Sequence, residues 1–272
     1  MAIAKGLAFL LLLCLSGCAM IQPVALSEQP AQTEVEQTTM SDRVDPQTQD
    51  FDGRVPRLEE ADELAWSYET IDLNGTTIEY ATLLPPNFDP AGEYPLLLAL
   101  PPGGQDKNMV NAGIDTFWQR GALYGFVIVS PVKPSGTSYM RDGSLILPEF
   151  VAFLHETYTI AGGKPHLGGV SNGGISTFKA GLEHPELYRS LTVLPGYAAA
   201  DSNLSTLSEL KVTLYVGEHD GRWVTSSQRT YDALVAANHN DPLLEIFPNE
   251  GHVIQSLTGN GVGQIFERLL QE

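Results

Sequence analysis

Three polar residues in the carboxyl-terminal half of the chain could together perform nucleophilic catalysis. Ser171 lies in Gly-Val-Ser-Asn-Gly-Gly at 169–174, Asp220 in Gly-Glu-His-Asp at 217–220, and His252 in Asn-Glu-Gly-His at 249–252. A serine hydroxyl is a weak nucleophile near neutral pH, so an imidazole must take its proton and a carboxylate must orient that imidazole. The pattern predicts a triad with Ser171 as nucleophile, His252 as base and Asp220 as orienting acid.

Neighbouring residues offer alternatives for the acid and the base. Glu218 could supply the carboxylate, but it lies nearer the end of the preceding strand, so Asp220 is favoured. Glu250 is interpreted as an exposed loop charge, and His219 would be the base only if the loop of His252 lay elsewhere. The remaining histidines fit surface or core positions; they are His155, His166, His184 and His239. No metal-ligand spacing is present, so we expect neither a metal site nor a cofactor.

Six short, mostly apolar runs, rich in β-branched or aromatic residues, alternate with segments of helical spacing. The runs lie at 96–100, 126–130, 166–170, 190–194, 212–216 and 243–247. The helical segments lie at 110–124, 145–158, 173–183, 224–238 and 254–270. Strands buried on both faces have continuous apolar sequences, and helix-length connections between them imply right-handed crossovers. The sequence therefore predicts an α/β fold with a mostly parallel central sheet and helices on both faces.

An antiparallel hairpin is expected before this alternation begins. Residues 66–73 and 76–83 have strand character and flank Asn74-Gly75, a strong signal for a two-residue hairpin turn. In open α/β sheets the functional residues collect on the loops that follow the carboxyl ends of the parallel strands. Ser171, Asp220 and His252 all lie on such loops.

The turn around Ser171 has the composition that an exposed nucleophile needs. It follows the strand at 166–170 and precedes a helix, and Gly169 and Gly173 allow a turn too tight for larger side chains. The amide of Asn172 would then face the oxyanion that forms on attack.

A second oxyanion donor is expected from Pro101-Pro102-Gly103-Gly104-Gln105, after the strand at 96–100. Proline has no N–H, so the donor must be Gly103, Gly104 or Gln105, and we favour the two glycines without separating them.

With these motifs in order, the sequence from about residue 66 to its end resembles the α/β-hydrolase superfamily. Within it, the chain is similar to lidless esterases related to secreted polyhydroxyalkanoate depolymerases, feruloyl esterases and dienelactone-hydrolase-like proteins. The resemblance implies an α/β-hydrolase fold, a serine esterase activity and an acyl-enzyme intermediate, with triad roles at Ser171, Asp220 and His252. The chain departs from the family at Pro101-Pro102, where a His-Gly sequence is usual.

No insertion long enough to form a lid is visible, which favours a solvent-open site and an exposed or polymeric ester substrate. Trp223 and Tyr197 are candidates to line the substrate pocket. Two alternatives share the same residues: a serine peptidase of the prolyl-oligopeptidase type, and a binding lipoprotein that kept the fold without the chemistry.

The amino-terminal residues 1–18 predict export. Lys5 precedes an apolar run that is too short to span a bilayer, as in a secretory signal peptide. The tetrad Leu15-Ser16-Gly17-Cys18 resembles the bacterial lipobox, which implies a lipid anchor on Cys18, and Ala19 implies sorting to the outer membrane. An ordinary signal peptide with a chance cysteine is the alternative.

Residues 19–63 are predicted to form an acidic disordered tether, because they contain eleven acidic and three basic residues and no sustained periodicity. The catalytic domain is expected at 64–272. The formal net charge of -18 for the whole chain argues against a nucleic-acid partner, since phosphate contacts need excess Lys and Arg. The oligomeric state is left open.

Overall fold

The computed structural model describes residues 64–272. Its main sheet has eight strands in the order β1-β2-β5-β4-β7-β8-β9-β10, and only the pairings of β2 with β1 and β5 are antiparallel. These strands are β1 (Ser67–Leu73), β2 (Thr76–Leu83), β4 (Leu96–Leu100), β5 (Val127–Pro131), β7 (His166–Gly169), β8 (Ser190–Val193), β9 (Lys211–Gly217) and β10 (Leu243–Phe247). The expected mostly parallel sheet with an antiparallel hairpin at one edge is confirmed.

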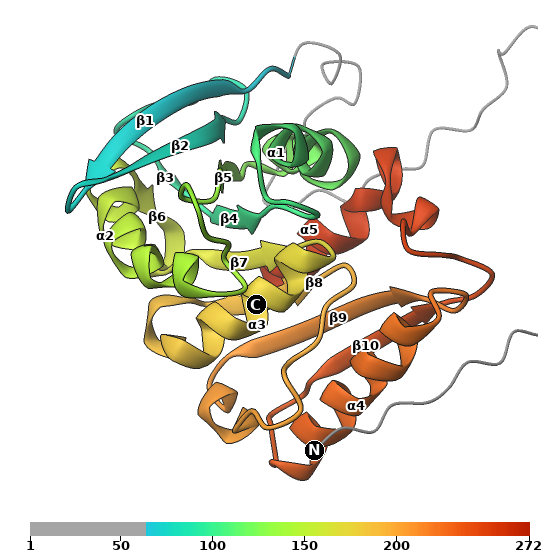
Figure 1. Cartoon of the computed structure of the whole chain (residues 1–272). Coiled ribbons are helices and arrows are strands. Elements are labelled where there is room, and N and C mark those ends of the chain that lie inside the picture. Colours follow the sequence, from blue (N-terminus) through green and yellow to red (C-terminus); the bar gives the residue numbers. More distant parts are fainter. Residues whose placement is uncertain (1–63) are drawn as a thin grey trace, which may run out of the picture. The chain divides into compact units, whose positions relative to one another are not determined.

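Five α-helices cover the two faces of the sheet (Figure 1). They are α1 (Lys107–Gly113), α2 (Leu147–Thr157), α3 (Asn172–Glu183), α4 (Arg222–Ala236) and α5 (Gly263–Gln271). Side chains of α2, α3 and α4 pack in one buried cluster, and those of α1 and α5 pack in a second. Among residues 64–272, no helix has the length and apolar character needed to cross a membrane.

The central strand β4 shows how the sheet divides the core. Leu96, Leu98 and Leu100 belong to the cluster with α2, α3 and α4, whereas Leu97 and Ala99 belong to the cluster with α1 and α5. Successive side chains of a strand point to opposite faces, so a strand that is covered on both faces must be apolar at every position. All five residues of β4 are fully buried.

Two expectations about the helices differ from the structure. The helical segment at 110–124 is α1 followed by a π-helical turn at Ile114–Trp118 and a 3₁₀ turn at Gln119–Tyr124. The segment at 254–270 contains 3₁₀ turns at Gln255–Leu257 and Gly259–Val262 before α5 begins. Gly259 has φ +53°, which interrupts a right-handed helix at that point.

The structure also contains a small second sheet, β3 (Glu93–Tyr94) with β6 (Thr159–Ile160), which the sequence does not predict. The predictions for residues 1–63, including Cys18, the signal peptide and the tether, lie outside the described residues.

Candidate active site

The structure places Ser171 on a sharp turn between β7 and α3. Its backbone has φ 57° and ψ -118°, a conformation that L-residues rarely adopt, and α3 begins at the next residue. A Cβ at Gly173 would lie 2.1 Å from the carbonyl oxygen of Leu100, and one at Gly169 would lie 2.3 Å from that of Gly173. Both positions therefore require glycine, as the sequence indicated.

Ser171, His252 and Asp220 lie within hydrogen-bonding distance of one another. The Ser171 Oγ is 2.9 Å from His252 Nε2, and His252 Nδ1 is 2.8 Å from an Asp220 carboxylate oxygen. An ionised carboxylate only accepts hydrogen bonds, so Nδ1 carries the proton and Nε2 is free to accept the serine proton. Sequence positions that are 81 and 32 residues apart meet because β7, β9 and β10 end at the same edge of the sheet.

The side chain of His252 is 41% exposed, whereas that of Asp220 is only 9% exposed. The imidazole is therefore reachable from solvent on one side and held by a mostly covered carboxylate on the other. Among the described residues, neither Glu218 nor Glu250 is hydrogen-bonded to His252, and His219 lies 4.0 Å from Glu218.

The two rival carboxylates hold the loop that carries His252. Glu218 accepts a hydrogen bond from the amide of Asn249 at 2.9 Å. Glu250 accepts hydrogen bonds from the amide of Gln255 and from the amide and hydroxyl of Ser256, and these bonds hold its pKa below the ordinary value. Both residues therefore hold the loop at 247–256 in place, whereas the sequence predicts an alternative acid at Glu218 and an exposed loop charge at Glu250.

The aromatic ring of Trp223 packs against the imidazole of His252. It is 9% exposed, and its ring centroid lies 5.0 Å from that of His252 and 5.2 Å from that of Tyr197. Tyr197 is half-buried. Of the two residues predicted for a substrate pocket, Trp223 contacts His252 and Tyr197 contacts Trp223, but Trp223 offers little free surface and supports the imidazole instead.

The loop of residues 101–105, which we call the glycine loop, forms a tight turn after β4. The amide of Gln105 donates to the carbonyl of Pro102 at 2.9 Å, so Gln105 cannot donate to an oxyanion. In the described part of the chain, no hydrogen-bond acceptor is paired with the amide of Gly103 or Gly104. The Asn172 side chain donates to the carbonyl of Gly103 at 2.9 Å, which fixes the glycine loop beside the nucleophile turn.

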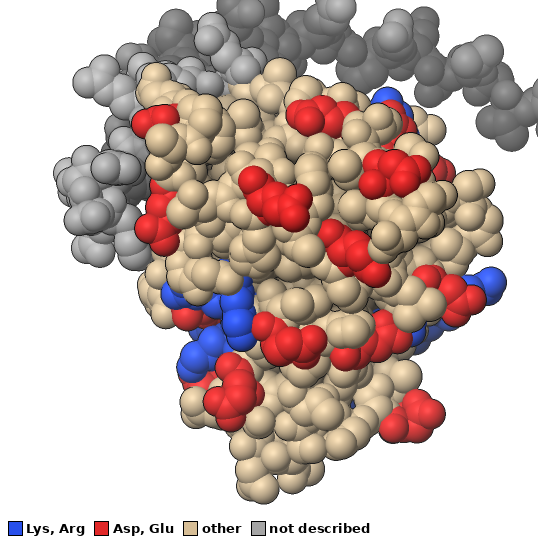
Figure 2. All heavy atoms as spheres, turned by 90° about the vertical axis from the view of Figure 1, so that its left-hand side faces the viewer, with Lys and Arg blue, Asp and Glu red and all other residues tan. Residues whose placement is uncertain are grey.

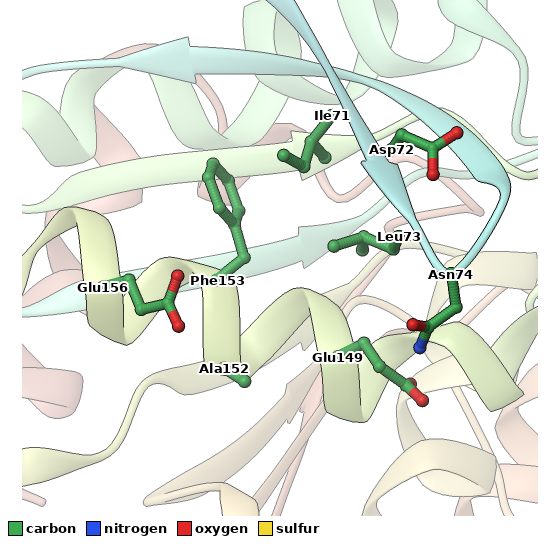
Figure 3. Close-up of a pocket in the computed structure, with 8 residues that line it drawn as sticks. All are labelled: Ile71, Asp72, Leu73, Asn74, Glu149, Ala152, Phe153 and Glu156. Atoms are coloured by element: carbon green, nitrogen blue, oxygen red, sulfur yellow. The ribbon is translucent and has the colours of Figure 1, made fainter.

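A hollow elsewhere on the surface lacks the chemistry of this site (Figure 3). It lies between the β1–β2 turn and α2, and it is lined by Ile71, Asp72, Leu73, Asn74, Glu149, Ala152, Phe153 and Glu156. None of the predicted site residues is among them. Three carboxylates and no nucleophile line the hollow, so we assign the chemistry to Ser171 and its neighbours.

Acidic residues outnumber basic ones in the described part of the chain. Figure 2 shows the face that carries the hairpin and α2, where Asp and Glu are scattered widely and Lys and Arg occur in fewer places. Residues 64–272 contain 22 acidic and 11 basic residues, and this excess repels polyanions. Within the same range, no group of three His, Cys, Asp or Glu side chains could hold a metal ion.

Comparison with known proteins gives matches at the level of structure. No protein-family model and no curated sequence matches this chain. A thermostable esterase superposes with a TM-score of 0.61 at 17% identity, covering 78% of this chain and 63% of its own. A feruloyl esterase module from Clostridium thermocellum, solved with sinapinate, gives 0.60 at 15% identity over 70% of this chain and 82% of its own. The chain has the α/β-hydrolase fold.

Proteins with other activities share this α/β-hydrolase fold. Pyrococcus horikoshii acylaminoacyl peptidase superposes with a TM-score of 0.58 at 14% identity, covering 76% of this chain and 41% of its own. The chain therefore spans less than two thirds of the thermostable esterase and of this peptidase. At these identities the α/β-hydrolase fold is what the similarity establishes, and a fold supports many activities.

Proposed function

We propose that this protein is a serine hydrolase that cleaves carboxylic esters through an acyl-enzyme intermediate. The observation that carries the proposal is the continuous hydrogen-bonded row from Ser171 through His252 to Asp220, at 2.9 and 2.8 Å. Nothing else in the described structure brings a hydroxyl, an imidazole and a carboxylate together in this order.

The geometry suits both halves of such a reaction. Ser171 Oγ attacks the acyl carbon while His252 Nε2 takes its proton, and the same imidazole then protonates the departing alcohol. Asp220 orients the ring and stabilises its charged form. The amide of Asn172, with that of Gly103 or Gly104, donates to the oxyanion; a missing donor of this kind lowers kcat by about 100- to 1000-fold. Water attacks the acyl-enzyme with His252 as base, which releases the acid.

The direct test assays the purified full-length protein on short p-nitrophenyl esters and treats it with a fluorophosphonate probe. Wild type should hydrolyse the esters and label with the probe, and Ser171→Ala should do neither. A wild-type protein that neither labels nor hydrolyses the esters would contradict the proposal and favour the alternative of a binding lipoprotein without catalytic activity.

Peptide-bond cleavage is the second candidate, and the match to acylaminoacyl peptidase favours testing it. Chromogenic peptide anilides assayed beside the esters separate the two activities. We expect ester turnover to exceed anilide turnover, and the opposite ratio would favour the peptidase.

We further propose that the enzyme acts while anchored in the bacterial envelope through a lipid on Cys18, with residues 19–63 as the tether. The lipobox-like tetrad supports this proposal. Labelling cells with a palmitate analogue should mark wild type and Cys14→Ala but not Cys18→Ala. Label that persists in Cys18→Ala would contradict the anchor.

A further inference from the structure

The side chain of Gln105 is fully buried beside the nucleophile turn, although its backbone amide is excluded as an oxyanion donor. It is 0% exposed, and its φ of +59° lies in the left-handed region, which is unfavourable for a residue other than glycine. A glycine would adopt this backbone without strain. The strained backbone must therefore be offset by the contacts that the side chain makes.

Those contacts use every strong hydrogen-bonding group of the amide. The Gln105 Nε2 donates to Ser176 Oγ at 2.9 Å and to the carbonyl of Pro101 at 3.3 Å. The Oε1 accepts from the amide of Tyr139 at 2.8 Å. An amide nitrogen has two protons, so both donors are satisfied, and the acceptor is paired as well.

The bonds connect three segments that are distant in sequence. Ser176 lies in α3, and its hydroxyl donates in turn to the carbonyl of Asn172 at 2.8 Å. Tyr139 lies in the loop after β5, and it is fully buried with its hydroxyl donating to Val132. Gln105 thereby ties the glycine loop to the helix that follows Ser171 and to a buried loop on its other side.

We propose that Gln105 is a positioning residue that holds the glycine loop in the geometry needed for its amides to meet the oxyanion. Its partner Ser176 relays that position to Asn172, which carries the other donor. The inference rests on the proposed serine hydrolase function. In this proposal a buried side-chain amide, and not the loop backbone alone, holds the two oxyanion donors in position relative to each other.

Gln105→Met keeps the length and volume of the side chain but removes all three hydrogen bonds. A misplacement of about 1 Å at a reacting centre lowers the rate by about 100-fold, so we expect kcat on p-nitrophenyl acetate to fall 10- to 100-fold. KM should change less than threefold. The affinity for a trifluoromethyl ketone, which forms an oxyanion adduct with the serine, should fall by the same factor as kcat/KM.

Ser176→Ala is the milder second variant, with an expected 3- to 10-fold loss of kcat. The double variant should lose no more kcat than Gln105→Met alone, because both changes interrupt the same connection.

Ser190→Ala is the matched control. It removes a buried hydrogen bond of 2.7 Å to His166 at the amino-terminal ends of β7 and β8, and it should leave kcat within twofold. A Gln105→Met variant with unchanged kcat, whether or not its KM is raised, would overturn the inference.

Hydrogen exchange supplies a readout that needs no activity. The amide of Gln105, which donates to the carbonyl of Pro102 in wild type, should exchange faster in Gln105→Met, and Ser190→Ala should leave it unchanged. If wild type hydrolyses no ester and resists the fluorophosphonate probe, the proposed function fails, and exchange still decides whether Gln105 anchors the loop. Unchanged exchange in Gln105→Met refutes the anchoring whatever the activity.

Discussion

The indole of Trp223 packs against the imidazole of His252, with ring centroids 5.0 Å apart and planes tilted by 49°. This contact restricts the rotation of a side chain that is otherwise 41% exposed. Trp223→Leu should therefore lower kcat about tenfold, because the imidazole spends less time aligned with Ser171 Oγ. Steady-state kinetics on a short ester measure the effect. Trp66→Leu, at a half-buried tryptophan on the hairpin side, is the control and should retain full kcat.

Two neighbouring carboxylates, Asp220 and Glu218, should respond very differently to mutation. Asp220→Asn should lower kcat by about 1000-fold or more, since the amide presents the wrong partner to His252 Nδ1. Glu218→Gln should lower it less than tenfold, because an amide oxygen can still accept from Asn249. Equal losses in the two variants, or a larger loss at Glu218, would contradict the assignment of the triad acid.

Gly217 and Gly251 form a matched pair for testing how closely the loop of His252 approaches β9. A Cβ at Gly217 would lie 2.2 Å from the carbonyl oxygen of Gly251, whereas a Cβ at Gly251 would meet no heavy atom within 4 Å. Gly217→Ala should destabilise the protein by about 2 kcal/mol or more and lower kcat at least tenfold, since the loop must move. Gly251→Ala should change stability by less than about 0.5 kcal/mol in urea unfolding.

Stability should depend on pH through His166. Its burial, with a smaller contribution from Arg189, lowers the pKa of this histidine to about 3. Between pH 6.5 and pH 3 this histidine binds a proton in the unfolded chain but not in the folded chain, so the free energy of unfolding falls as the pH falls. The loss is about 2 kcal/mol between pH 6.5 and pH 4.5.

The substitution His166→Asn removes the titrating group, so the difference in unfolding free energy between the two pH values should shrink by that amount. His155→Asn, at an exposed position, should behave as wild type. If the pH dependence of His166→Asn matched that of wild type, another group would have to be responsible.

The strands, the hairpin and the turn at Ser171 could be predicted because their signals are local. Continuous apolar runs identify doubly covered strands, and Asn74-Gly75 adopts positive φ at both positions, as a two-residue hairpin turn requires. The pairing of β3 with β6 could not be predicted, since each strand has two residues and depends on the surrounding fold for its position.

The positioning residues were beyond sequence reasoning for a related reason. The sequence around Gln105 bears only on its backbone amide, because its side-chain partners Ser176 and Tyr139 lie 71 and 34 residues away. The sequence predicts an exposed loop charge at Glu250, but its hydrogen bonds to Gln255 and Ser256 form only once the loop is folded. Polar residues acquire such roles from tertiary contacts, which a linear pattern does not encode.

The left-handed backbone at Ser171 lowers the stability of the fold but is needed for activity. A non-glycine residue with φ 57° and ψ -118° stores strain of the order of 1 to 3 kcal/mol, and that strain exposes the hydroxyl. A glycine at this position would relax the turn and abolish the nucleophile. Evolutionary or laboratory selection for thermostability alone would therefore be expected to favour loss of catalysis here.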